Sequence, residues 1–98
     1  MIPFYYFNTF KSIPNCIHAI TTKAENEPYT FSVALHTGED SSAIIKNRKK
    51  SIEQLHWNKK LAFIVANQTH SDHIYIVSDT TSRGWEDIAT VVADCDAL

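Results

Sequence analysis

The segment from Ser41 to Leu55 constrains the fold most, because its apolar spacing matches a helix of several turns. Projected at about 100° per residue, its apolar side chains fall on one arc and most of its polar side chains fall outside it. The arc holds Ile44, Ile45, Ile52 and Leu55, and the residues outside it are Lys46, Asn47, Lys50, Glu53 and Gln54. Asp40 or Ser41 can cap this segment, because each carries an oxygen that can accept a first-turn N–H. The sequence therefore predicts one amphipathic helix.

Arg48 lies in the middle of the apolar arc, four residues after Ile44 and four before Ile52. A guanidinium on an apolar face is costly unless it is paired or faces a cleft. Two explanations remain open. The side chain either reaches water at the edge of the stripe or forms a buried salt bridge, or it points into a cleft and binds an anionic or oxygen-rich ligand.

Several short apolar segments predict β-strands. Two of them alternate apolar and polar residues, and one is a continuous apolar run typical of a strand buried on both faces. Pro3 makes the first of them an edge strand at best. The segments are 2–7, 17–22, 29–35, 61–66, 73–77 and 88–92. With one main helix they predict an α+β fold with a mixed or antiparallel sheet.

Composition excludes several classes of protein. The 98 residues suffice for one small domain of the soluble, globular kind. The net charge of -2 gives no electrostatic case for nucleic acid or an anionic membrane, and no apolar run is long enough for a membrane span. Two distant cysteines without C-x-x-C spacing, and an N-terminus without signal-peptide features, predict a cytoplasmic protein with reduced thiols.

The polar segment N-Q-T-H-S-D-H, residues 67–73, separates two apolar runs and holds two histidines. Histidine binds zinc or copper and moves protons near neutral pH. The simplest explanation is a polar loop with two solvated histidines, but loops at strand ends often carry functional sites. His70 is the stronger candidate, because Gln68 and Asp72 flank it and can orient its ring. The segment is also the predicted connection of a hairpin, or of two strands that meet at a site.

The other polar clusters favour structural roles. Cys95 lies between two aspartates, whose charge disfavours the thiolate, so a structural cysteine is expected. His36, Glu39 and Asp40 are typical of a turn followed by a helix cap. A catalytic zinc site needs three protein ligands, and the residues by themselves support only His70. We therefore predict no catalytic residue within this chain.

Five short motifs follow one another in an order that resembles the YfiH-like family, also called laccase-domain or polyphenol-oxidase-like proteins. They are H-A-I-T-T-K at 18–23, V-A-L-H-T-G-E-D at 33–40, N-R at 47–48, N-Q-T-H at 67–70 and A-D-C-D-A-L at 93–98. Three departures accompany the match. Lys23 replaces an arginine, Ser32 and Ala34 stand where an asparagine is usual, and no proline follows A-D-C as in the family's metal-cysteine motif. Cys95 is therefore not assigned as a ligand.

The resemblance implies that His70 is the first ligand of a zinc site, which a later cysteine and a later histidine complete. It implies that Arg48 and Gln68 bind the substrate, and that phosphate or water attacks a purine nucleoside in a phosphorylase or deaminase reaction. It also implies that residues 1–98 are the N-terminal part of a single α/β sandwich domain whose C-terminal part is missing. The alternatives are a copper-dependent polyphenol oxidase and a non-catalytic binding or assembly fragment.

Overall fold

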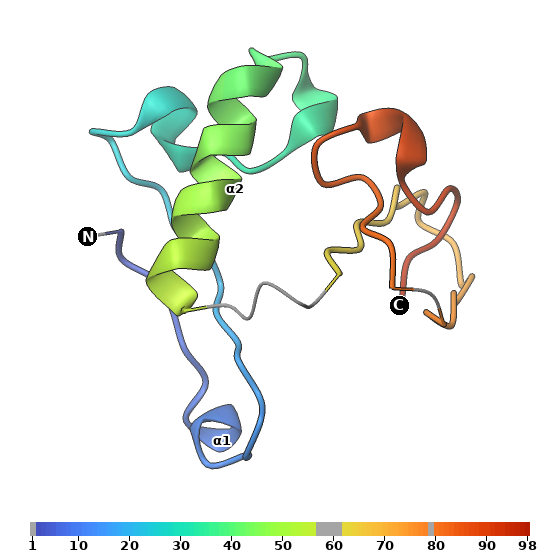
Figure 1. Ribbon diagram of the computed structural model, residues 1–98, viewed down its shortest axis with the longest axis horizontal. Coiled ribbons are helices and arrows are strands. Elements are labelled where there is room, and N and C mark those ends of the chain that lie inside the picture. Colours follow the sequence, from blue (N-terminus) through green and yellow to red (C-terminus); the bar gives the residue numbers. More distant parts are fainter. Residues whose placement is uncertain (1, 57–61, 79) are drawn as a thin grey trace. The chain divides into compact units, whose positions relative to one another are not determined.

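The computed structural model describes residues 2–56, 62–78 and 80–98. Contacts divide the chain into two compact units, Met1–Trp57 and Asn58–Leu98, each of which is described by itself. The first unit carries the longest helix, and the helical elements are labelled as in Figure 1. They are α1 (Asn8–Lys11), the 3-10 helices η1 (Pro28–Phe31) and η2 (Leu35–Thr37), α2 (Ser41–Leu55), and the 3-10 helix η3 (Ile88–Thr90).

Helix α2 confirms the predicted helix, including its first and last residues. Asp40 is the N-cap, and its carboxylate accepts the Ser42 backbone N–H at 3.3 Å and the Ser42 hydroxyl at 2.9 Å. These bonds satisfy a donor that the first turn leaves without an intrahelical partner. The helix ends at His56, whose φ of 54° is left-handed and stops the helical repeat.

The buried face of α2 is more polar than the apolar arc predicts. Ile44 is fully buried, but Asn47 is only 1% exposed and Arg48 only 5% exposed. The Ser51 hydroxyl, also buried, donates to the Asn47 carbonyl at 3.2 Å. Asn47 was expected outside the buried arc. It is buried because main-chain carbonyls of the preceding loop lie against this side of the helix and need donors.

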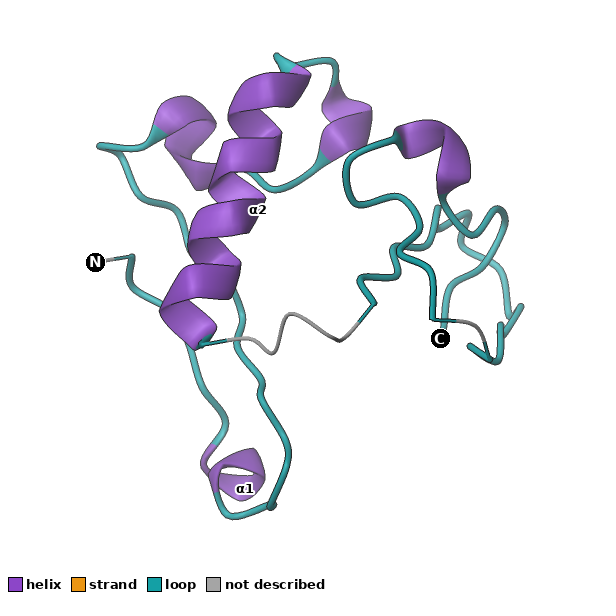
Figure 2. Ribbon diagram, in the orientation of Figure 1, coloured by secondary structure: helices purple, strands orange, loops and turns teal. Residues whose placement is uncertain are grey.

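The predicted mixed or antiparallel sheet is wrong, and with it the α+β assignment within a larger sandwich. No residue in the described part of the chain belongs to a β-strand, and Figure 2 shows only helices and loops there. Four isolated bridges replace the sheet: Tyr5 with Ile20 is antiparallel, and Ile64 with Arg83, Ala66 with Val92 and Ile74 with Ala97 are parallel. Each pair of segments exchanges only two or three backbone hydrogen bonds, whereas a ladder needs their regular repetition.

Two of the predicted strands contain helical turns instead. In 29–35, Pro28 opens η1, and Tyr29, Thr30 and Phe31 have φ of 51°, 51° and 69°, which an extended strand does not allow. In 88–92 the Asp87 carboxylate accepts the Ala89 N–H at 3.0 Å and starts η3. The alternation of apolar and polar residues gave a wrong prediction in both places, because local caps and tertiary contacts determine the backbone angles there. The first residue of the predicted 61–66 strand lies outside the described residues.

The polar segment 67–73 does not join the two strands of a hairpin among the described residues. The apolar stretch before it bonds to Arg83 and Val92, with Val65 N–H to Arg83 O at 2.9 Å and Asn67 N–H to Val92 O at 2.9 Å. The stretch after it bonds to the end of the chain, with Tyr75 N–H to Ala97 O at 3.0 Å. The C-terminal segment therefore pairs with both sides of the loop.

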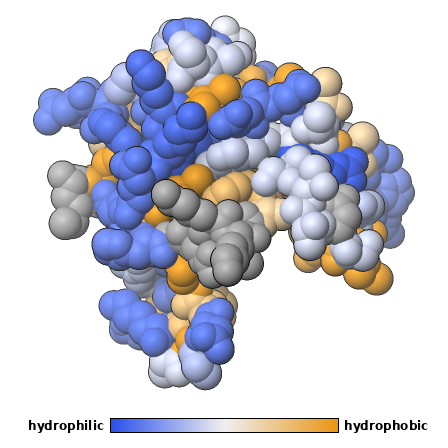
Figure 3. Space-filling model, in the orientation of Figure 1, coloured by the Kyte–Doolittle hydropathy of each residue, from blue (hydrophilic) through white to orange (hydrophobic). Residues whose placement is uncertain are grey.

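Large apolar side chains remain exposed along the N-terminal hairpin, where orange and tan residues lie among blue polar ones (Figure 3). The hairpin closes through the Tyr5–Ile20 bridge. The exposed apolar residues on it are Tyr5, Tyr6, Phe7, Phe10, Ile13, Ile17 and Ile20. Among the described residues, no helix has both the length and the apolar character needed to cross a bilayer.

Candidate functional site

The loop that carries His70 is held by a carboxylate from the C-terminal segment. Asp96 accepts the Thr69 backbone N–H at 3.0 Å and the Ser71 hydroxyl at 3.1 Å through the same oxygen. Hydrogen bonds from the backbone of Thr69 and then of Ser71 lower the pKa of Asp96, because they stabilise the charged form. The conformation of the loop therefore depends on hydrogen bonds to the ionised Asp96 carboxylate, in addition to hydrogen bonds within the loop itself.

His73 takes part in the same arrangement. Its Nδ1 lies 3.0 Å from a carboxylate oxygen of Asp94 and 3.1 Å from the Asp94 carbonyl oxygen. The Thr69 hydroxyl also donates to the Asp94 carboxylate. His73 is therefore a tether between the loop and the C-terminal segment.

His70 occupies the exposed turn of the loop, with a left-handed φ of 59°. Within the described ranges, no residue hydrogen-bonds or ion-pairs with its ring, so neither Gln68 nor Asp72 orients the imidazole as predicted. Gln68 is likewise exposed on the same loop. The structure brings Gln68 and His70 onto one short segment, while their metal-binding and substrate-binding roles stay predictions.

The described residues do not assemble a complete metal site. No group of three or more His, Cys, Asp or Glu side chains with metal-binding geometry occurs among residues 2–56, 62–78 and 80–98. Cys95 is 2% exposed, and its thiol lies 2.8 Å from the Ala97 carbonyl oxygen, which matches the structural cysteine expected from the sequence. A catalytic zinc needs three protein ligands, so a metal-binding role of His70 stays a prediction.

Arg48 lies in the first unit, where its guanidinium is directed at the main chain. Its Nε donates to the Val33 carbonyl at 2.8 Å, and burial lowers the pKa of the side chain. A buried guanidinium that binds a carbonyl fixes the segment between η1 and η2 against α2. At 5% exposure the side chain does not reach water freely, and a role of Arg48 in ligand binding stays a prediction.

A family comparison now adds to this geometry. The sequence profile described as multi-copper polyphenol oxidoreductase laccase matches residues 17–98. The chain belongs to this family. The matched range contains Arg48, Gln68 and His70, so the resemblance noted in the sequence is confirmed. Neither the curated proteins nor the solved structures contain a match to the chain.

Sequence reasoning missed two residues that shape these segments of the laccase-family chain. Asn47 donates from Nδ2 to the Pro28 carbonyl at 3.0 Å and to the Ser32 carbonyl at 2.8 Å, and so clamps both ends of η1. Asp96 organises the His70 loop from the far end of the sequence. In the sequence, Asn47 stood out only as part of the N-R motif, since helical projection placed it on the solvent side. Asp96 stood out only as part of the A-D-C-D-A-L motif.

Proposed function

We propose that this chain is part of a zinc-dependent purine nucleoside enzyme, with His70 as one metal ligand. The match of residues 17–98 to the laccase family carries the proposal. The loop geometry supports it, because Asp96 holds the loop while the exposed His70 ring makes no hydrogen bond within the described residues. A ring without a protein partner keeps both nitrogens for a metal and for an orienting group.

The family resemblance implies that a later cysteine and a later histidine complete the site. Arg48 and Gln68 bind the substrate, and the small-molecule partners are a purine nucleoside and phosphate. The proposal covers two reactions of the same class of substrate. In phosphorolysis, phosphate attacks the anomeric carbon of the sugar and the purine base leaves, and in deamination, water attacks the amino-bearing carbon of the base and ammonia leaves. Zinc, when bound, supplies Lewis-acid chemistry.

The test begins with metal binding by the 98-residue chain. Zinc titration monitored by calorimetry should show weak binding that His70→Ala removes. His36→Ala is the matched control, because His36 is also exposed but lies in the other unit, and it should leave the titration unchanged. Equal zinc binding by wild type and His70→Ala would contradict the assignment of His70.

The reaction is tested in a longer protein that carries the other two ligands. With inosine or adenosine, phosphate and zinc, we expect release of free base or of ammonia, and loss of that release in His70→Ala. The 98-residue chain by itself should release neither. A longer protein that is inactive would overturn the enzyme proposal in favour of a non-catalytic binding role. Activity that survives His70→Ala would overturn the assignment of His70 as a ligand.

Copper-dependent oxidation of phenols is the second candidate, because the family is that of the multi-copper polyphenol oxidoreductase laccases. Loading the longer protein with copper and adding a phenol distinguishes it from nucleoside chemistry. A copper absorption band together with oxygen consumption would support the oxidase. Base release with zinc and no phenol oxidation with copper would support the nucleoside enzyme.

A further inference from the structure

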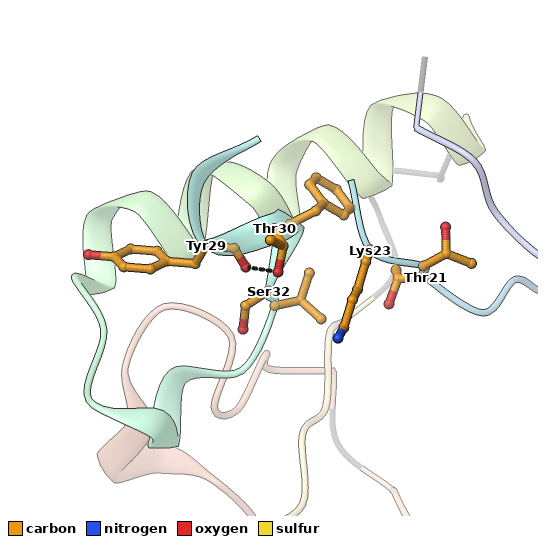
Figure 4. A pocket seen from close by; sticks show the side chains of 8 residues that line it. Thr21, Lys23, Tyr29, Thr30 and Ser32 are labelled. Carbon is orange, nitrogen blue, oxygen red and sulfur yellow. Dashed lines mark hydrogen bonds between the residues drawn. The ribbon is translucent and has the colours of Figure 1, made fainter. Parts of the chain in front are cut away.

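A small cavity in the first unit is lined by two segments, 21–23 and 29–33, and has a volume of about 240 Å³. Figure 4 shows Lys23 and Thr21 entering it from one segment and Thr30 and Ser32 from the other. Drug-sized ligands occupy pockets of roughly 300–1,000 Å³, so this cavity suits a smaller ligand. The phenol ring of Tyr29 points away from Lys23, which leaves the centre of the cavity to short side chains.

The hydroxyl groups around the cavity differ in whether their protons are free. Thr22 donates to the Pro3 carbonyl, and Thr30 donates to the Tyr29 carbonyl at 2.7 Å, so both protons are already used. The Ser32 hydroxyl accepts the Ala34 N–H at 3.3 Å and keeps its own proton free.

Thr21 forms no hydrogen bond within the described residues, and the Lys23 ammonium there forms no ion pair. In Figure 4 the polar ends of Lys23, Thr21 and Ser32 point to the same side of the cavity. None of the eight lining residues is acidic. The nearby Glu27 carboxylate is bound to Lys50 at 2.6 Å, so its charge is compensated. The cavity therefore presents three hydrogen-bond donors and one positive charge without a competing carboxylate.

The segment that carries Ser32 is fixed in an unusual conformation. Three consecutive residues without glycine have left-handed backbone angles, from Tyr29 to Phe31. Such strain persists only where surrounding contacts over-determine it, and it gathers at binding sites. Asn47 supplies those contacts by binding the carbonyls at both ends of the turn, and Phe31 is 2% exposed beneath it. The segment that carries the Ser32 hydroxyl is thus held in place before any ligand binds.

We propose that this cavity binds a tetrahedral oxyanion, with the Lys23 ammonium and the hydroxyls of Thr21 and Ser32 as donors. One cation and two free hydroxyl protons without a carboxylate in the lining favour an anion over a neutral sugar or base, because an anion accepts all of these hydrogen bonds and its charge strengthens them. The proposal rests on the proposed function only in naming phosphate as the physiological oxyanion. The geometry itself requires neither the metal nor the nucleoside.

The test is a phosphate titration of the isotopically labelled 98-residue chain, without zinc or nucleoside, at constant ionic strength. We expect amide signals of residues 21–33 to shift and saturate. Lys23→Met should weaken binding at least tenfold, and Ser32→Ala should weaken it a few-fold. Lys46→Met is the matched control, because Lys46 is an exposed lysine of α2 outside the cavity, and it should bind like wild type.

Sulfate that saturates the same signals supports a site for tetrahedral oxyanions. Shifts that rise linearly and spread over all lysines, or saturation unchanged by Lys23→Met, would overturn the site. The two proposals fail separately. His70→Ala should leave phosphate binding intact, while an active longer protein whose KM for phosphate is unchanged by Lys23→Met would refute the oxyanion site and leave the enzyme proposal standing.

Discussion

The carboxylate of Asp96 accepts the backbone N–H of Thr69 at 3.0 Å, although the two residues are 27 positions apart in the sequence. This contact ties the loop that carries His70 to the end of the chain. It is strengthened by the Ser71 hydroxyl, which donates to the same oxygen at 3.1 Å. The exposed histidine therefore depends on a distant aspartate for its placement.

Replacing Asp96 with asparagine should loosen this loop. The amide keeps one accepting oxygen but loses the charge that strengthens the bonds from Thr69 and Ser71. Amide hydrogen exchange should become faster at residues 69–71. Asp72→Asn is the control, because Asp72 is an exposed aspartate of the same loop with no hydrogen bond inside the described ranges. Equal exchange rates in the two variants would show that Asp96 does not organise the loop.

The same contact predicts a dependence on acid. Because hydrogen bonds from the backbone of Thr69 and Ser71 lower the folded pKa of Asp96, its carboxylate stabilises the folded loop at neutral pH. That stabilisation is complete above the ordinary aspartate pKa of about 3.9 and is lost as the pH falls through the lower folded value. Carbon NMR of the side-chain carboxyls should give Asp96 a titration midpoint below the ordinary aspartate value. A midpoint at or above that value would contradict the lowered pKa.

Asn47→Leu should destabilise the first unit by about 1–3 kcal/mol, because the Pro28 and Ser32 carbonyls lose their donor at a buried position. Urea unfolding followed by circular dichroism measures the change. The control Asn26→Leu alters an exposed asparagine and should change the free energy of unfolding by no more than about 0.5 kcal/mol. A loss at Asn47 no larger than at Asn26 would mean that the clamp contributes no stability.

The two glycines form a matched pair for substitution by alanine. Gly38 has φ of 83° and no atom within 4 Å of an added Cβ, so Gly38→Ala should cost only the left-handed backbone penalty of about 1–2 kcal/mol. At Gly84 the φ is 72°, and an added Cβ would lie 2.6 Å from Val91 Cγ1 and 3.0 Å from Val65 Cβ. Overpacking should therefore add about 1–3 kcal/mol at Gly84.

Thermal unfolding of the two glycine variants ranks these costs. Gly84→Ala should lower Tm more than Gly38→Ala, and it should loosen the contacts between the Val65 and Val91 segments. The reverse ranking, or two equal shifts, would show that the close approach at Gly84 relaxes without cost.

The candidate site was only partly predictable from residue types. The pattern singled out His70 and Arg48, since a histidine on a polar turn and an arginine on an apolar stripe both stand out locally, and their functional roles stay predictions. It could not find Asn47 or Asp96. Their partners are main-chain groups 15 to 27 positions away, and no local pattern records such contacts.

The sequence by itself determined helix α2, its Asp40 cap and the membership of residues 17–98 in the laccase family. Those features depend on neighbouring residues or on motif order, and both can be seen in the printed chain. The tertiary structure decided the rest, namely which side of α2 is buried, why the alternating segments form isolated bridges instead of a sheet, and how the His70 loop is held. The physical reason is that alternation shows only which side chains are apolar. Strand pairing also requires a second backbone segment that stays alongside the first over several residues.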